Sequence, residues 1–356
     1  MKRFSVIFPG LLLATIIFII SDFLSQYIGK NILGYPKSPI STVMFSIILG
    51  ILIGNLFNIP SIFSAGLSFS LKFILRLGIV LLGIRLSFSD VALYGATSAA
   101  LIVICIISVI LIIYVMVHYF KISASMSYLI AIGTSICGAS AIVATAPVIN
   151  AKKAEVTYAI ANITIFGIIG MFLYPYLANH LFQGDVNRIG LFLGTAIHET
   201  AQVAAAGLIY EQQFNDARVL EISTITKLVR NTFLIVMIPL FAYFYTRNSS
   251  NKHTSYSILN IFPLFVLGFL VMVIVRSVGD GLFINDHGVF SNDFWNHAII
   301  TMKSTSAVLL SIAMASLGVL TNLKEIRTMG YRPFLIGFVA ASMIGLVSFL
   351  IISLFI

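Results

Sequence analysis

Charged residues are scarce in this chain, and their scarcity excludes an ordinary soluble protein. Only 9% of its 356 residues are Asp, Glu, Lys or Arg, whereas 59% are hydrophobic and the mean hydropathy is +1.06. Soluble domains carry about 25% charged residues, so this chain cannot cover a water-facing surface. The composition therefore predicts an integral membrane protein in contact with the lipid bilayer.

Cysteines are few, and clusters of basic residues are lacking. Cys105 and Cys137 have no metal-ligand spacing, which excludes a disulfide framework and the common zinc sites. The net charge of +9 comes from basic residues scattered at the ends of apolar runs, without a basic tail or an aromatic–basic platform. We therefore expect contact with lipid head groups and none with nucleic acid. No segment resembles a nucleotide-binding loop, and we expect no cofactor.

Apolar runs, by contrast, are abundant, and many have the roughly 20 residues that a bilayer-spanning helix needs. The first run lacks a small-x-small cleavage site, so we interpret it as a retained helix. The connections are short, so we expect one all-α, polytopic membrane domain over residues 1–356. About eleven candidate spans are predicted: 7–28, 40–58, 68–87, 95–118, 125–149, 155–179, 188–210, 222–246, 258–277, 298–320 and 333–355.

The loop charges favour a cytoplasmic N-terminus. Lys2 and Arg3 precede the first span, and the 321–332 loop on the same side holds three further basic residues. The 278–297 loop on the other side holds three Asp and no Lys or Arg. Basic loops stay on the cytoplasmic side, so the C-terminus is expected outside.

Two segments of the chain look like copies of one another. Residues 133–149 read GTSICGASAIVATAPVI and residues 194–210 read GTAIHETAQVAAAGLIY; we call them the first and second Gly-Thr segments. Small and polar residues inside an apolar run indicate either a close helix-packing seam or a helix that opens to bind a solute. Paired, Gly-interrupted segments in a membrane protein are typical of a transporter site. We expect both to be broken, over 133–140 and 194–202, and to meet near the middle of the membrane, where they would hold the solute.

A further internal match predicts an inverted repeat. Residues 83–95 (GIRLSFSDVALYG) align without gaps to residues 318–330 (GVLTNLKEIRTMG), and an odd number of predicted crossings separates them. Such segments point in opposite directions across the membrane, as inverted repeats do. The two Gly-Thr segments point the same way in the same count, which leaves open whether they belong to this duplication.

The first Gly-Thr segment predicts a break in its helix. Gly138 costs about 1 kcal/mol in a helix interior, and Pro147 limits the helix at its far end. A break would leave N–H groups and a positive dipole end that favour an anion. The alternative is a tight packing seam made by the same small residues. The candidate substrate-binding residues here are Thr134, Ser135, Cys137, Gly138, Ala139 and Ser140.

The second Gly-Thr segment carries ionisable groups inside an apolar run, where they are costly and usually functional. Glu199 and His198 are the candidate coupling residues, because a carboxyl there must be neutralised by a proton, a cation or a partner. The alternative is that both merely brace a neighbouring broken helix. A zinc-protease helix would need a second His where Gln202 stands, so no metal site is predicted. Thr195, His198, Thr200 and Gln202 complete the candidate substrate-binding set.

Five residues in neighbouring spans could assist. Arg76 lies inside the third span and could pair with Glu199 or face an anionic substrate. Lys227, Arg230 and Asn231 lie early in the eighth span and form either an anion-attracting vestibule or ordinary interfacial anchors. A further polar residue in the sixth span, Asn162, is a candidate for bracing the predicted break.

The motifs LRLGIVLLGIRLS, GTSICGASAI, HETAQVAAAG and KLVRN resemble the YeiH-like, bacterial sulfate exporter family of multi-pass inner-membrane proteins, over nearly the whole chain. The order of spans is more distantly similar to bile-acid/sodium symporters and sodium/proton antiporters. The resemblance implies inverted repeats with discontinuous helices, a bacterial inner-membrane location and secondary transport. The sulfate assignment of that family comes from genomic context.

Together these features predict a secondary transporter of a small inorganic or organic anion, such as sulfate or an organosulfonate, working by alternating access. A proton or a sodium ion would couple transport, and a homo-oligomer is compatible with the sequence. The alternative is a non-transporting membrane protein, either an intramembrane enzyme or a structural subunit. The sequence offers no nucleophilic triad and no metal-binding triad that would favour an enzyme.

Overall fold

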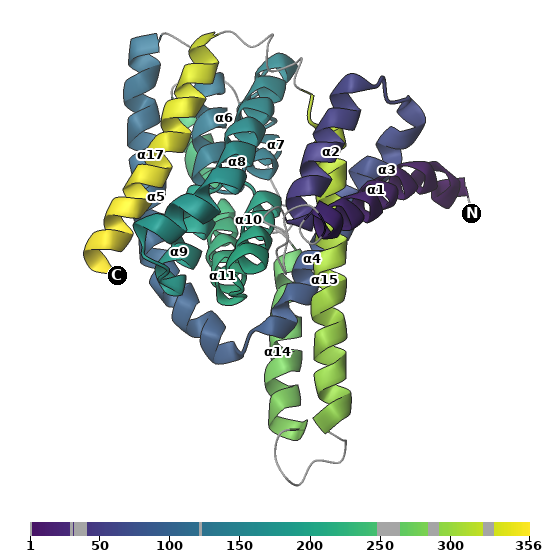
Figure 1. Ribbon diagram of the computed structural model, residues 1–356. Helices are drawn as coiled ribbons and strands as arrows, with labels where there is room; N and C mark the ends of the chain where they lie inside the picture. The colour runs from purple at the N-terminus through teal and green to yellow at the C-terminus, as the bar shows by residue number, and fades with distance from the viewer. Residues whose placement is uncertain are drawn as a thin grey trace. The chain divides into compact units, whose positions relative to one another are not determined.

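The computed structural model describes residues 2–28, 31, 41–120, 123–247, 264–283, 292–322 and 331–356, and all regular structure within these ranges is helical (Figure 1). The helices are α1 (Lys2–Tyr27), α2 (Thr42–Leu56), η2 (Ser61–Phe63), α3 (Ser64–Phe69), η3 (Ser70–Ile74), α4 (Leu75–Leu82), η4 (Gly83–Arg85), α5 (Phe88–Phe120), α6 (Ala124–Ser135), α7 (Ala139–Thr145), α8 (Lys153–Leu181), α9 (Val186–Ala196), α10 (Thr200–Phe214), α11 (Arg218–Thr232), α12 (Leu234–Arg247), α14 (Phe265–Phe283), α15 (Asn292–Leu320) and α17 (Tyr331–Phe355).

The chain is an all-α, polytopic membrane protein, as its composition predicts. Eight helical segments in the described ranges are long and apolar enough to cross a membrane, and α2 is a shorter apolar helix. The remaining two predicted spans, 125–149 and 188–210, are each interrupted: α6 and α7 make up the first, α9 and α10 the second. This arrangement agrees with the predicted eleven spans.

The helices group into two compact units, each made of separate stretches of the chain. Unit 1 comprises residues 1–92, 208–217 and 264–324, and unit 2 comprises residues 93–207, 218–263 and 325–356. The prediction of one membrane domain over the whole chain stays a prediction, as does the cytoplasmic side of the N-terminus.

Small residues let the helices of unit 1 pack closely. In Figure 1, α2 lies beside α15. A methyl group added at Gly50 of α2 would lie 2.5 Å from the Ala315 carbonyl oxygen, and one at Gly54 would lie 2.2 Å from that of Val319. Glycines four residues apart allow such backbone approach in a membrane, where van der Waals packing holds helices together.

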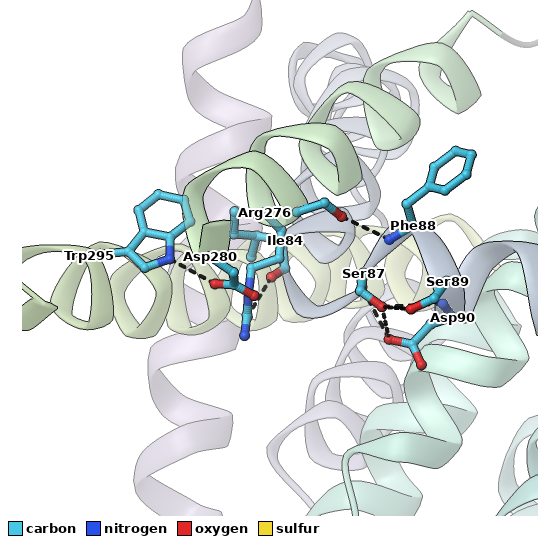
Figure 2. Close-up of polar contacts among 9 residues, drawn as sticks. Ile84, Ser87, Phe88, Ser89, Asp90, Arg276, Asp280 and Trp295 are labelled. Atoms are coloured by element: carbon cyan, nitrogen blue, oxygen red, sulfur yellow. Dashed lines mark hydrogen bonds and ion pairs between the residues drawn. The ribbon is translucent and has the colours of Figure 1, made fainter. Parts of the chain in front are cut away.

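A polar network fixes the turn between α4 and α5 in unit 1 (Figure 2). Arg276 of α14 donates from Nε to Asp280 at 2.6 Å and from Nη1 to the Ile84 carbonyl at 3.1 Å. Trp295 of α15 donates to the other oxygen of Asp280 at 2.9 Å. This turn opens the predicted repeat segment 83–95. Most of its counterpart lies outside the described residues, so the inverted repeat stays a prediction.

Unit 2 is built around α9, which packs against α8, α11 and α17. The Thr195 hydroxyl of α9 lies 2.6 Å from the Ser348 hydroxyl of α17. Phe182 and Phe192 meet edge to face, with ring centroids 5.7 Å apart. This core holds the two interrupted helices, and the candidate site lies within unit 2.

Candidate functional site at two interrupted helices

The first interruption lies where the sequence predicts it. Helix α6 ends at Ser135 and α7 begins at Ala139, with Gly138 between them at φ +68° and ψ −128°. This backbone conformation is open to glycine and strongly disfavoured for residues with a Cβ. The predicted break at Gly138 is therefore confirmed, and an uninterrupted packing seam is excluded.

The second Gly-Thr segment is broken in the same way. Helix α9 ends at Ala196, Ile197 is extended with φ −88° and ψ 140°, and α10 begins at Thr200. The Glu199 carbonyl accepts the Val203 N–H at 2.9 Å, so Glu199 stands at the start of α10. The sequence predicts a broken segment over 194–202, and the interruption at 197–199 lies within it.

The two interruptions touch each other. The Ala139 N–H donates to Glu199 Oε1 at 3.2 Å, so the carboxyl group of one segment binds the backbone of the other. A Cβ added at Gly138 would lie 2.4 Å from Glu199 Cγ, which leaves room there for glycine alone. The predicted adjacency of Gly138 and Glu199 is confirmed, while their depth in the membrane stays a prediction.

Lys227 of α11 binds carbonyl groups from both interruptions. Its ammonium donates to the Ile136 carbonyl at 2.8 Å and to the Ile197 carbonyl at 2.9 Å, and the His198 carbonyl accepts a third bond. An ammonium group has three donors, so all of them are used. Lys227 is completely buried.

Arg230, one turn further along α11, binds the ends of α6 and α9. Its Nε donates to the Ser135 carbonyl at 2.7 Å and its Nη2 to that of Thr134. Its Nη1 donates to the Thr195 carbonyl at 2.7 Å and to the Ile197 carbonyl at 3.3 Å. The planar guanidinium suits this task, because its donors point in fixed directions toward several acceptors.

These contacts complete the hydrogen bonding at the end of α6. A helix leaves its last four carbonyls without internal partners. Here the Ile132 carbonyl accepts from the Ile136 N–H, and the Gly133 carbonyl from the Gly138 N–H at 3.0 Å. The other two orphan carbonyls are those bound by Arg230. A helix can therefore end inside the protein without unsatisfied backbone groups.

The electrostatic partners of Lys227 and Arg230 are backbone dipoles. Among the described residues, no carboxylate forms an ion pair with either cation within 4.0 Å. A helix C-terminus carries roughly −0.5 of an elementary charge, so two such ends offset about one of the two positive charges. The site therefore keeps a net positive charge.

The three residues of α11 are not interfacial anchors, and the vestibule predicted for them stays a prediction. Lys227, Arg230 and Asn231 are only 0, 1 and 2% exposed, whereas an anchor would be open to water or lipid. Asn162, the candidate for bracing the break, is 1% exposed and lies against Gly337 of α17, and its bracing role stays a prediction. Two basic residues three positions apart in one span lie on the same helix face, and this spacing could have indicated that they bind the same partner.

Two predicted site residues face neighbouring helices. The Thr195 hydroxyl bonds the Leu191 carbonyl at 2.7 Å and meets α17, as described above. Gln202 donates to the Thr164 carbonyl of α8 at 3.1 Å and packs against Gly167. Their side chains stabilise helix packing in unit 2, and a role in holding substrate stays a prediction.

Only a small part of the site lies at the protein surface. Thr134, Ser135, Cys137 and His198 are buried, whereas Ala139, Ser140, Glu199 and Thr200 are partly or fully exposed. Asn231 donates to the Thr200 hydroxyl at 3.0 Å. Arg76 belongs to unit 1, where its guanidinium lies 5.8 Å from the Phe265 ring centroid, and its pairing with Glu199 stays a prediction.

Comparisons with known proteins agree on one family. The family model described as Conserved hypothetical protein 698 matches residues 9–337. A UPF0324 membrane protein of Streptococcus agalactiae is 34% identical over 339 residues, 95% of this chain and 94% of the relative. Those of Clostridium tetani and Fusobacterium nucleatum are 31% and 33% identical, covering 98% and 86% of this chain and 97% and 88% of the relatives. No solved structure matches.

Proposed function

We propose that this chain, which belongs to the UPF0324 family of membrane proteins, is a secondary transporter of a small anion. The UPF0324 family is the sulfate exporter family that the motifs of this chain resemble. One observation carries the proposal: two interrupted helices meet through the Ala139 N–H and the Glu199 carboxyl group. Interrupted helices that meet inside a membrane protein are the usual site of solute and ion binding in secondary transporters.

The charge balance at the interruptions favours an anion. Lys227 and Arg230 contribute two positive charges, and the ends of α6 and α9 offset about one of them. An ionised Glu199 offsets one more positive charge, and the N-terminal ends of α7 and α10 add about half a charge each. When Glu199 takes up a proton, the positive charge of the site rises by one, which a solute anion can neutralise.

Glu199 is therefore the coupling residue of this proposal. Its carboxylate and the solute anion would satisfy the same positive charge, so the anion binds best when Glu199 is protonated. Proton and anion would then move together in one direction. The contact surface offered to the solute is the exposed start of α7 and α10, including Ser140 and Thr200. Sulfate or an organosulfonate fits the charge and the small polar groups.

Reconstitution into liposomes tests this function. Purified protein is reconstituted into liposomes, and a pH difference is set up across their membrane. Uptake of radiolabelled sulfate, sulfite and small organosulfonates is then followed. We expect pH-driven flux of at least one anion, with protein-free vesicles as the control. A folded protein that moves none of these anions at any pH gradient would contradict the proposal and favour a non-transporting membrane protein.

A further inference from the structure

We propose that the ammonium group of Lys227 is a built-in substitute for a bound cation, and that it makes this protein independent of sodium ions. The inference rests on the proposed transport function for its meaning in a transport cycle. Of the two coupling ions that the sequence allows, a proton and a sodium ion, this assignment excludes the sodium ion.

The geometry around Lys227 is that of a cation site. Three carbonyl oxygens converge on Nζ, those of Ile136, Ile197 and His198. They come from both interrupted helices. In transporters built on broken helices, unwound carbonyls and helix C-termini of this kind coordinate the sodium ion. In this protein the position is filled by a side chain.

The occupant cannot exchange with solution. Lys227 is fixed by its own backbone on α11, its side chain is completely buried, and each of its three donors is used. The adjacent carbonyls are also taken, because Arg230 binds those of Thr134, Ser135 and Thr195. A sodium ion would have to displace a tethered charge to reach this position.

The choice of lysine at this position fits a single compact charge. An ammonium is a point charge with three donors, whereas a guanidinium spreads its donors over a plane. Lys227 therefore occupies one coordination centre, and Arg230 bridges several carbonyls along the two helix ends. Removing the Lys227 side chain should leave a vacant site lined by carbonyl oxygens.

The test compares two substitutions at the same position. Lys227→Ala removes the ammonium and opens the space, whereas Lys227→Met removes the charge and keeps the space filled. Thermal unfolding of both variants and of the wild type is measured in detergent against ammonium, methylammonium, sodium and choline chloride at constant ionic strength. Choline is too large for the site and serves as the ionic control.

We expect Lys227→Ala to unfold at a lower temperature than the wild type and to be rescued by ammonium or sodium. A cation at about ten times its Kd raises the folded-to-unfolded ratio about tenfold. Lys227→Met and the wild type should not respond. Failure of every small cation to rescue a folded Lys227→Ala protein would overturn the inference, and so would equal rescue of Lys227→Met.

Wild-type protein supplies the second arm, which needs no variant to fold. Its melting temperature, and its anion flux in liposomes, should be the same in sodium and choline chloride. A rise of melting temperature or flux with sodium would overturn the inference. The melting measurements require no transport, so absence of flux would refute the proposed function while leaving the assignment of Lys227 to be judged by the melting results.

Discussion

The sharpest prediction concerns Gly138, where two separate costs can be worked out for Gly138→Ala. Its φ of +68° is unfavourable for alanine by about 1–3 kcal/mol. The new methyl group would lie 2.4 Å from Glu199 Cγ and 3.1 Å from Glu199 Oε1, and relieving such a contact costs about 1–3 kcal/mol. We therefore expect Gly138→Ala to lower the free energy of unfolding by about 2–6 kcal/mol, summed from these two costs.

Gly184 provides a control for a positive φ without the contact. It has φ +80°, and a methyl group added there would meet nothing within 4 Å. Gly184→Ala should show the backbone cost alone. Both variants are purified in the same detergent, and their thermal unfolding is compared with that of the wild type.

The double variant Gly138→Ala/Glu199→Ala gives a second check. Truncating Glu199 removes the atoms that the new methyl group would meet, so the double variant should lose less stability than the two single losses added together. Equal melting temperatures for Gly138→Ala and Gly184→Ala, together with simple additivity in the double variant, would refute the contact between the two interrupted helices.

Three further predictions concern the same region. Glu199→Gln should abolish pH-driven flux while anion exchange persists in part; unchanged pH-driven flux at normal melting temperature would remove Glu199 from the mechanism. Arg230→Lys should lower the free energy of unfolding by about 2–5 kcal/mol, because a lysine cannot reach all four carbonyls and orphaned buried acceptors cost about 1–3 kcal/mol each; wild-type melting would contradict this. Thr195→Val should lose about 1 kcal/mol of stability by breaking the Ser348 hydrogen bond and leave flux unchanged; a changed substrate affinity would instead place Thr195 at the solute.

The sequence alone was sufficient for the class of the protein and for the expectation that both Gly-Thr segments are broken. Apolar runs separated by short connections can only satisfy their backbone groups in a membrane as helices, which predicts the all-α fold. Gly138 marks its break because a glycine costs stability inside a helix and permits a positive φ outside it. The second break carries no glycine at its centre, so the sequence predicts a broken segment over 194–202 without the position of the break.

The roles of the polar side chains were decided by the tertiary structure. A basic residue near the end of an apolar run looks the same in sequence whether it reaches the membrane surface or turns inward. Lys227 and Arg230 turn inward because the packing of α11 against α9 brings two sets of orphan carbonyls within their reach. Likewise, Gln202 donates to the Thr164 carbonyl of α8, a partner 38 residues away in the chain that the sequence does not point to. Composition and spacing determine which residues must find partners inside the membrane, and only packing determines which partners they find, because those partners come from segments that are distant in the chain.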